Sequence, residues 1–304
     1  MENIKKKIGE LCKERNAVIL AHNYQRPEVQ DIAHIVGDSL ELSLKASETE
    51  ADILVFCGVH FMAETASILC PDKKVLLPVI SAGCPMAEMI TPESLKKEKL
   101  KNPDAVVISY VNTTAGVKAE SDICCTSANV INVVKSVDPG RPVLMTPDRN
   151  LARFAASSCS GEGRNITWWN GYCPIHDMLD YEHVKKVKKL NPSALFIVHP
   201  ECRPDVLSLA DAVRSTSGMF RYVAESGADK FIIGTETGIL HQMALRFPDR
   251  TFIPADQSMV CSDMKKITLE HIVKSLETMS PEVKVPDHIR LKAYSAVERM
   301  LAIR

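Results

Sequence analysis

The stretch Ser81-Ala82-Gly83-Cys84-Pro85-Met86 is a short loop with one cysteine, and two more cysteines follow it at almost the same interval. Cys84 plus 89 is Cys173, and Cys173 plus 88 is Cys261. Four other sets recur with a period of 88 or 89: His22–Tyr110–His199, Ser39–Ser127–Thr216, Ala66–Ala155–Ala244 and Pro103–Pro192–Pro281. A constant interval is typical of repeated supersecondary units, so we predict three copies of one α/β module.

Apolar runs alternate with helical segments in the same order in each copy. Short apolar runs bounded by turn residues are typical of buried parallel strands. We predict such strands at 17–21, 53–57, 74–79, 105–109, 142–146, 165–169, 194–198, 230–234 and 251–255. Strands that alternate with helices favour parallel sheets with right-handed crossovers. The expected fold is therefore α/β, with three pseudo-threefold-related three-layer α/β/α domains around a central active-site cavity.

The period also suggests how the 304 residues divide. We predict a first repeat over 1–85, a second over 86–174, and a third over 175–304 that includes a C-terminal helical extension. Because no Gly/Ser-rich or Pro-rich tract separates them, the repeats should share interfaces. The carboxyl ends of parallel strands form the ligand face of such sheets, and all three periodic cysteines follow strands. The three loops are thus expected to meet at one cavity.

Composition limits the classes of partner and compartment. The net charge is −1 with 25% charged residues, which gives no indication of nucleic acid or an anionic membrane surface. No apolar run approaches the length of a membrane span, and the N-terminal residues lead into no signal sequence, so we expect a soluble, cytoplasmic protein. Ten cysteines in such a protein favour reduced thiols over a disulfide framework, with some acting as ligands.

Cys84, Cys173 and Cys261 suggest a metal centre, because no other set of cysteines recurs in all three copies. Cys70 and Cys159 are also 89 residues apart, but the third copy has no cysteine at the corresponding position. Three reduced structural thiols are the alternative. A zinc site is a further alternative, although structural zinc usually takes four ligands from paired Cys-x-x-Cys knuckles, which the chain lacks. A [4Fe–4S] cluster on three thiolates would leave one iron open as a Lewis acid, which suits hydro-lyase chemistry. Helices predicted at Pro85 and Pro174 would favour the preceding thiolates.

Polar side chains follow several predicted strands. They are candidates for catalysis or, alternatively, for structural groups whose hydrogen bonds are satisfied within the protein. This set comprises His22, Tyr24, Tyr110, Asn112, His199 and Glu201. Glu201 is the best candidate general base. Ser39, Ser127 and Thr216 are expected to open helices, either as N-caps or as part of an anion site. His176, His183 and His241 lie inside helical patterns and are assigned to structure, and Trp168-Trp169 to the strand core.

Several motifs together resemble the quinolinate synthase family over essentially the full length. They are Ala21-His22-Asn23-Tyr24, Gly37-Asp38-Ser39, Val59 to Thr65, Gly83 to Met86, Tyr110 to Thr113, Gly171 to Cys173, His199 to Cys202, Ser215 to Met219 and Asp256 to Cys261. The resemblance implies three α/β/α domains and a [4Fe–4S] cluster on Cys84, Cys173 and Cys261. It also implies condensation of iminoaspartate with dihydroxyacetone phosphate to quinolinate in NAD biosynthesis, with a functional link to an aspartate-oxidising enzyme.

The resemblance further implies roles for individual residues. Glu201 resembles the acid/base group, and Tyr24 and Tyr110 resemble residues that orient the intermediate. Implied substrate contacts are His22, Ser39, Tyr110, Val111, Asn112, Ser127, His199, Pro200, Glu201, Ser215 and Thr216. Some members carry Cys-x-x-Cys-x-x-Cys around the last ligand, whereas this chain has Cys261-Ser262-Asp263-Met264, so thiol–disulfide regulation does not carry over. Rival functions are another cluster-dependent hydro-lyase for a small dicarboxylate and a non-catalytic iron or redox sensor.

Overall fold

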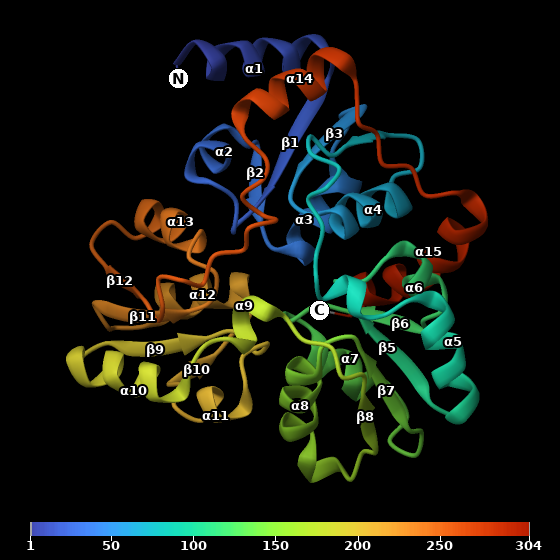
Figure 1. The fold of residues 1–304 in the computed structure, drawn as a ribbon, viewed down its shortest axis with the longest axis vertical. Coiled ribbons are helices and arrows are strands. Elements are labelled where there is room, and N and C mark those ends of the chain that lie inside the picture. The colour runs from blue at the N-terminus through green and yellow to red at the C-terminus, as the bar shows by residue number, and fades with distance from the viewer. Residues whose placement is uncertain (1, 304) are drawn as a thin grey trace.

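The computed structural model describes residues 2–303 of the chain. Figure 1 shows three lobes, blue, green and yellow to orange in order of sequence, around a common centre. The first lobe contains α1 (Glu2–Glu14), β1 (Ala17–His22), α2 (Pro27–Ile32), β2 (Ile35–Gly37), α3 (Ser39–Glu48), β3 (Ile53–Cys57), α4 (His60–Leu69) and β4 (Lys74–Leu76). Each of its strands except β4 leads into a helix, as the sequence pattern predicts for parallel strands.

The second and third lobes repeat this alternation. The second contains η1 (Ala87–Met89), α5 (Pro92–Lys101), β5 (Val106–Tyr110), α6 (Ala115–Ala119), β6 (Ile123–Cys125), α7 (Val130–Ser136), β7 (Val143–Thr146), α8 (Arg149–Ser158), η2 (Ser160–Glu162) and β8 (Ile166–Trp168). The third contains α9 (Pro174–Asp177), α10 (Tyr181–Leu190), β9 (Leu195–Val198), α11 (Pro204–Leu207), β10 (Ala212–Val213), α12 (Thr216–Glu225), β11 (Lys230–Gly234), α13 (Ile239–Arg246) and β12 (Thr251–Pro254).

The sheets of the three lobes have one and the same strand order. Over residues 2–303 these orders are β2-β1-β3-β4, β6-β5-β7-β8 and β10-β9-β11-β12. All the strand pairs in these sheets are parallel. The prediction of three α/β/α units with parallel sheets is therefore confirmed, and the sequence period corresponds to a repeated topology.

The sequence pattern missed one strand in each lobe, namely β2, β6 and β10. Each is two or three residues long, which is too short for an apolar run to stand out. β4 was expected to reach residue 79 but ends at Leu76. Beyond that point the backbone pairs with the C-terminal part of the chain, because Leu77 N donates to Pro281 O.

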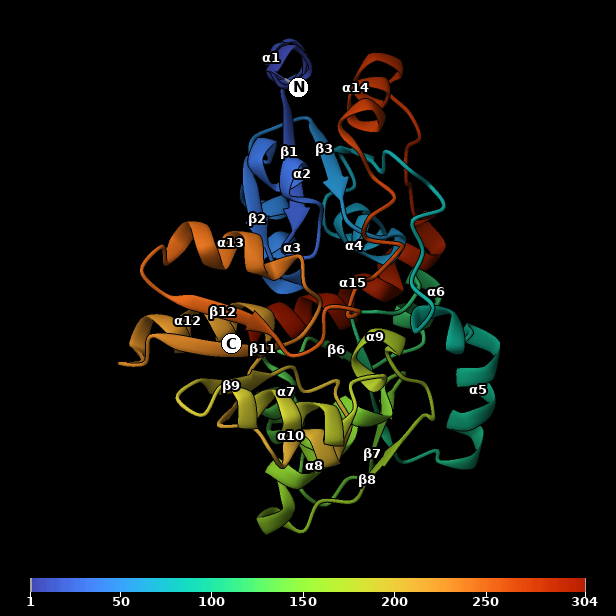
Figure 2. The same cartoon turned by 60° about the vertical axis from the view of Figure 1, so that its left-hand side comes forward.

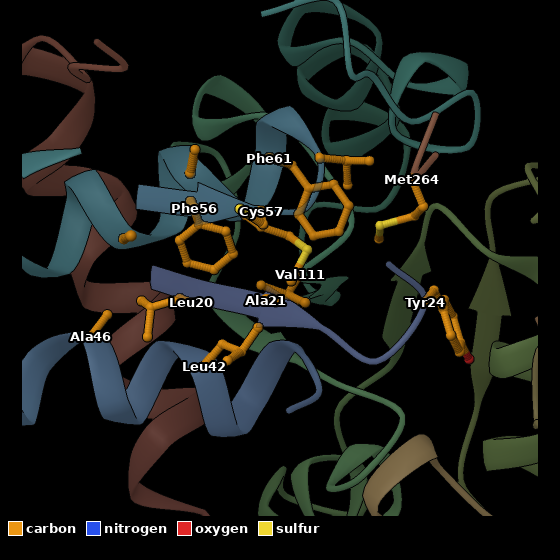
Figure 3. Close-up of a cluster of buried hydrophobic side chains, with 14 of the residues drawn as sticks. Leu20, Ala21, Tyr24, Leu42, Ala46, Phe56, Cys57, Phe61, Val111 and Met264 are labelled. Atoms are coloured by element: carbon orange, nitrogen blue, oxygen red, sulfur yellow. The ribbon is translucent and has the colours of Figure 1, made fainter. Parts of the chain in front are cut away.

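The central strands are buried because helices cover both faces of each sheet. Every residue of β3 and β5 is buried. Figure 3 shows Leu20 of β1 with Leu42 and Ala46 of α3 in one cluster of buried side chains. The same cluster includes Val111 of the second lobe, so the apolar core runs from one lobe into the next.

The outer strand β8 departs from the expected core. Trp168 is 38% exposed, and the guanidinium of Arg153 lies over its ring at 5.7 Å. Trp169 follows the strand and donates through Nε1 to Met89 O at 2.9 Å. The prediction that both tryptophans lie in the strand core is wrong for Trp168, because β8 is the edge strand of its sheet. Trp169 lies just outside the strand but packs, partly buried, against a small buried apolar cluster.

The C-terminal extension returns to the first two lobes. The helix α14 (Leu269–Thr278) packs beside α1, and α15 (Asp287–Ala302) packs against α4, α6 and β6, as Figure 2 shows. Asn129 Nδ2 also donates to the backbone of Met300 and Ile303 near the end of α15. The domain ranges 1–85, 86–174 and 175–304 stay predictions. Among residues 2–303, no helix is both long and apolar enough to cross a membrane.

Candidate active site and metal centre

A cavity lies where the three lobes meet, and all of them supply its wall. Its lining includes His22, Tyr24, Ser39, Cys84, Tyr110, Asn112, Ser127, Cys173, His176, His199, Glu201, Thr216, Glu236 and Cys261. These residues lie at or beyond the carboxyl ends of strands, which form one face in a parallel α/β sheet. The three periodic cysteines therefore share one cavity although they are far apart along the chain.

The three thiols are held in a setting that disfavours their charged forms. Loss of contact with water raises the pKa of the Cys84 thiol to about 12, and nearby Cys261 adds to the rise. The pKa of Cys173 is raised by burial, by Glu201 and by Cys84. A bound cation would remove the mutual repulsion of three thiolates, because a coordinating metal deprotonates thiols outright. The thiol set therefore suits a metal centre better than three free anions.

The backbone around two of these cysteines differs from the expectation. No helix begins at Pro85, since the next element is the short 3₁₀ turn η1 from Ala87. α9 does begin at Pro174, with Cys173 at its N-cap position, but it is only four residues long. The predicted helix at Pro85 is wrong, because the chain there continues as a turn, but backbone N–H groups of Ala87 and Met86 still act to lower the pKa of Cys84.

Glu201 lies at the centre of a buried group of side chains. Its Oε2 is 2.8 Å from His176 Nδ1 and 3.1 Å from His199 Nδ1. The rings of the two histidines are stacked, with centroids 4.6 Å apart. His176 Nδ1 also lies 3.2 Å from Cys173 Sγ. Cys173, His176 and Glu201 present ligand atoms that all lie within 4.8 Å of one another, so they could hold a metal ion.

The Glu201 carboxylate is ionised, and only one of its two oxygens has hydrogen-bond partners among the described residues. Burial alone would raise its pKa, but the two neighbouring histidines outweigh that effect and lower the pKa well below its usual value. Burial lowers the pKa of His199, although Glu201 opposes the shift. Among the described residues, Glu201 Oε1 has no hydrogen-bond partner and is shielded from solvent. A buried oxygen without a partner is costly unless a ligand supplies one.

Tyr24 is joined to this group through hydroxyls. Its OH lies 2.5 Å from Thr235 Oγ1 and 3.2 Å from Thr216 Oγ1. Thr235 Oγ1 lies in turn 2.8 Å from His176 Nε2. Burial raises the pKa of Tyr24 well above its usual value, so the phenol is neutral and can donate a proton in a hydrogen bond. Tyr24 and Glu201 are therefore connected by one chain of polar contacts.

The periodic hydroxyls line the cavity but are not the helix caps. Asp38 caps α3, with its Oδ1 accepting from Leu40 and Glu41, and Ser215 caps α12. α7 begins only at Val130, after Ser127. The expectation that Ser39, Ser127 and Thr216 are N-caps is wrong. Their hydroxyls are left for other partners, and Ser127 Oγ lies 3.1 Å from His199 Nε2.

Some of the other implied site residues line the cavity, and some do not. His22 accepts the N–H of Tyr24 at its Nδ1, and Asn112 Oδ1 has no partner among the described residues. Burial and Glu201 raise the pKa of Tyr110 well above its usual value. The residues that do not line the cavity are Val111, Pro200 and Ser215. Their role as substrate contacts stays a prediction.

Sequence reasoning missed three residues of this site. His176 was assigned to structure, but it is buried and contacts both Glu201 and Cys173. Its position three residues after Cys173 on one helical turn could have revealed it, because such residues share a helix face. Thr235 and Glu236 follow β11 directly, at the carboxyl end where ligand-facing residues are expected.

The fold and the cavity define an α/β protein with a candidate metal-dependent active site at the junction of three lobes. The family model described as quinolinate synthetase A protein matches residues 6–302. The chain therefore belongs to the quinolinate synthase family, whose members are enzymes of NAD biosynthesis.

Close relatives support the same conclusion over the whole chain. The quinolinate synthase of Desulforudis audaxviator is 55% identical over 296 residues, which cover 97% of each chain. That of Geobacter metallireducens is 54% identical over 302 residues, covering 99% of this chain and 98% of the relative. Quinolinate synthase 2 of Methanosarcina acetivorans is 50% identical over 300 residues, covering 99% and 96%.

Proposed function

We propose that this chain condenses iminoaspartate with dihydroxyacetone phosphate to form quinolinate, with loss of phosphate and two waters. Iminoaspartate would come from an aspartate-oxidising enzyme. The observation that carries the proposal is the combination of one ionised carboxylate oxygen without a partner, on Glu201, and three thiols in the same buried cavity. The first suits proton transfer to or from a substrate, and the second suits a metal centre.

Glu201 is the proposed acid/base group. Its Oε2 is held by His176 and His199, which leaves Oε1 to take up or return a proton. A general base must be within hydrogen-bond reach of the substrate, and its orientation must be fixed. The two histidines supply that orientation, since their contacts come from different segments of the chain. Tyr24 and Tyr110, both kept neutral by burial, orient the intermediate as hydrogen-bond donors.

The proposed substrates carry carboxylates and a phosphate, and these anionic groups need hydrogen-bond donors from the protein. Ser39, Ser127 and Thr216 bring one hydroxyl from each lobe to the cavity. Ser39 and Thr216 are also the first residues of α3 and α12, where the positive end of a helix favours anions. His22 and Asn112 complete the proposed contacts with polar groups at the ends of β1 and β5.

A [4Fe–4S] cluster would be held by Cys84, Cys173 and Cys261. The residues fit it, because three thiols from separate lobes line one cavity and their pKa values show mutual influence. Three thiolates leave one iron of such a cluster open, which supplies Lewis-acid assistance to loss of a hydroxyl group. The protein side chains then have to bind the substrates, move protons at Glu201 and exclude bulk water.

Anaerobic purification followed by an assay tests this function. The protein should be brown and should form quinolinate from aspartate, an aspartate-oxidising enzyme and dihydroxyacetone phosphate. A protein that contains the iron–sulfur cluster and makes no quinolinate, but dehydrates a small dicarboxylate, would support the rival hydro-lyase function. A protein that contains the cluster and has neither activity would support a sensor function. A colourless, zinc-loaded protein after treatment with iron and sulfide would contradict all three functions.

A further inference from the structure

Two buried carboxylates make the same contact with two of the periodic cysteines. Asp148 Oδ2 accepts the backbone N–H of Cys173 at 3.0 Å, and Glu236 Oε1 accepts that of Cys261 at 3.1 Å. Each acid stands 25 residues before its cysteine, and Asp148 and Glu236 are 88 residues apart, as are the two cysteines. The contact is therefore part of the repeat and occurs at equivalent places in the second and third lobes.

Both carboxylates are anchored independently of the cysteines. Asp148 is 2% exposed, and its Oδ1 accepts from Leu151 N at 2.6 Å as the N-cap of α8. Glu236 is fully buried, and its Oε2 accepts from Gly238 N at 2.7 Å. Each acid follows the end of a central strand, β7 or β11. One oxygen thus fixes the acid to its own loop, and the other oxygen reaches the cysteine loop.

The first lobe uses a different residue for a similar contact. Position 59, which is 25 residues before Cys84, is a valine. Instead, Asp263 Oδ1 accepts the N–H of Gly83 at 3.1 Å, and Lys266 Nζ donates to Ser81 O at 2.6 Å. Asp263 comes from the third lobe, two residues after Cys261. All three cysteine loops therefore have a backbone N–H held by a carboxylate, although the equivalent acid is present in only two lobes.

We propose that Asp148 and Glu236 are positioning residues for the sulfur atoms of Cys173 and Cys261. This inference rests on the proposed cluster. A charged acceptor makes a stronger hydrogen bond to a backbone N–H than a neutral one does. Holding that N–H fixes the peptide plane next to the cysteine and so restricts the direction of its side chain. The cluster would then meet sulfur atoms that need little rearrangement, and ligand orientation of this kind raises metal affinity.

The variants Asp148→Asn and Glu236→Gln test the role with little change in shape. In Asp148→Asn one oxygen is left for the N–H groups of Leu151 and Cys173, so the NH₂ group of the amide faces one of them. In Glu236→Gln one oxygen is left for Gly238 N and Cys261 N, and the ion pair of Glu236 Oε1 with Lys265 Nζ at 2.9 Å is lost as well. In Asp148→Asn the cap of α8 can persist, because asparagine caps helices about as well as aspartate. Asp122→Ala is the matched control, since Asp122 Oδ2 accepts Val107 N at 2.8 Å and does not line the cavity.

The measurement is the rate at which the reconstituted holoenzyme loses iron to a chelator without air, followed by absorbance. We expect both amide variants to lose iron about tenfold faster than wild type or more, and Asp122→Ala to match wild type. Thermal unfolding of each apoprotein separates this effect from global destabilisation. Wild-type release rates in both amide variants would overturn the positioning role while leaving the cluster intact. Failure of the wild type to take up iron and sulfide would instead overturn the proposed function and this inference with it.

Discussion

At the scale of single residues, the two oxygens of Glu201 have different surroundings. Oε2 contacts two histidines, whereas Oε1 is buried without a partner among the described residues. We expect Glu201→Gln to lower kcat by about 10²–10⁴-fold, because positioned general acid–base catalysis contributes that much. Iron and sulfide content should stay at the wild-type level. Steady-state quinolinate formation checks this, and unchanged turnover would remove Glu201 from the mechanism.

His22 should make the apoprotein sensitive to acid. Burial lowers its pKa from 6.5 to about 4, with Lys265 and His199 acting in the same direction and Asp38 against it. Between these values the unfolded chain binds a proton that the folded chain does not, so stability falls as the pH drops from about 6.5 to 4.

The variant His22→Asn tests this dependence, because its side-chain oxygen can still accept the N–H of Tyr24. Urea unfolding at pH 7 and pH 5 should show a smaller loss of stability in His22→Asn, by on the order of 1–2 kcal/mol. An equal loss in both proteins would assign the acid sensitivity to other groups.

At the scale of elements, the central strands were predictable because they are buried on both faces and read as apolar runs. The strand 53–57 was predicted with the bounds that β3 has. Helix starts were less predictable, because Asp38 and Ser215 cap α3 and α12 where the next residue was expected to do so. Several polar residues in a row can all serve as caps, and the backbone conformation, which the sequence does not display, selects one.

Asp38 joins two elements of different lobes. Its Oδ1 caps α3, and its Oδ2 accepts from Ser217 Oγ at 2.5 Å in α12. Asp180 is a matched control, since its Oδ1 accepts His183 N at 2.8 Å as the N-cap of the surface helix α10. We expect Asp38→Ala to cost about 1–3 kcal/mol more than Asp180→Ala, because it also leaves a buried hydroxyl unpaired. Urea unfolding of both variants measures the difference, and equal costs would show that the contact between α3 and α12 adds nothing.

At the scale of the whole molecule, the constant period carried the prediction of three like units and of cysteines that share one cavity. Tyr110 and His199 occupy equivalent positions, and both line that cavity. The return of α14 and α15 to the first two lobes was not predictable, because amphipathic helices do not reveal which surface they cover. The contact of His176 with Glu201 was equally hidden, since the two residues lie in separate segments of the third lobe and share no sequence pattern.

The proposed active site requires three cysteine loops, one from each repeat, to hold a single metal centre. Iron and acid-labile sulfide per chain, measured after anaerobic reconstitution of alanine variants, test it most directly. Wild type and Cys57→Ala should each bind about four iron and four sulfide, since Cys57 is buried away from the cavity lining. Cys84→Ala, Cys173→Ala and Cys261→Ala should each lose the cluster. A full complement of iron and sulfide in any of these three variants would contradict the account.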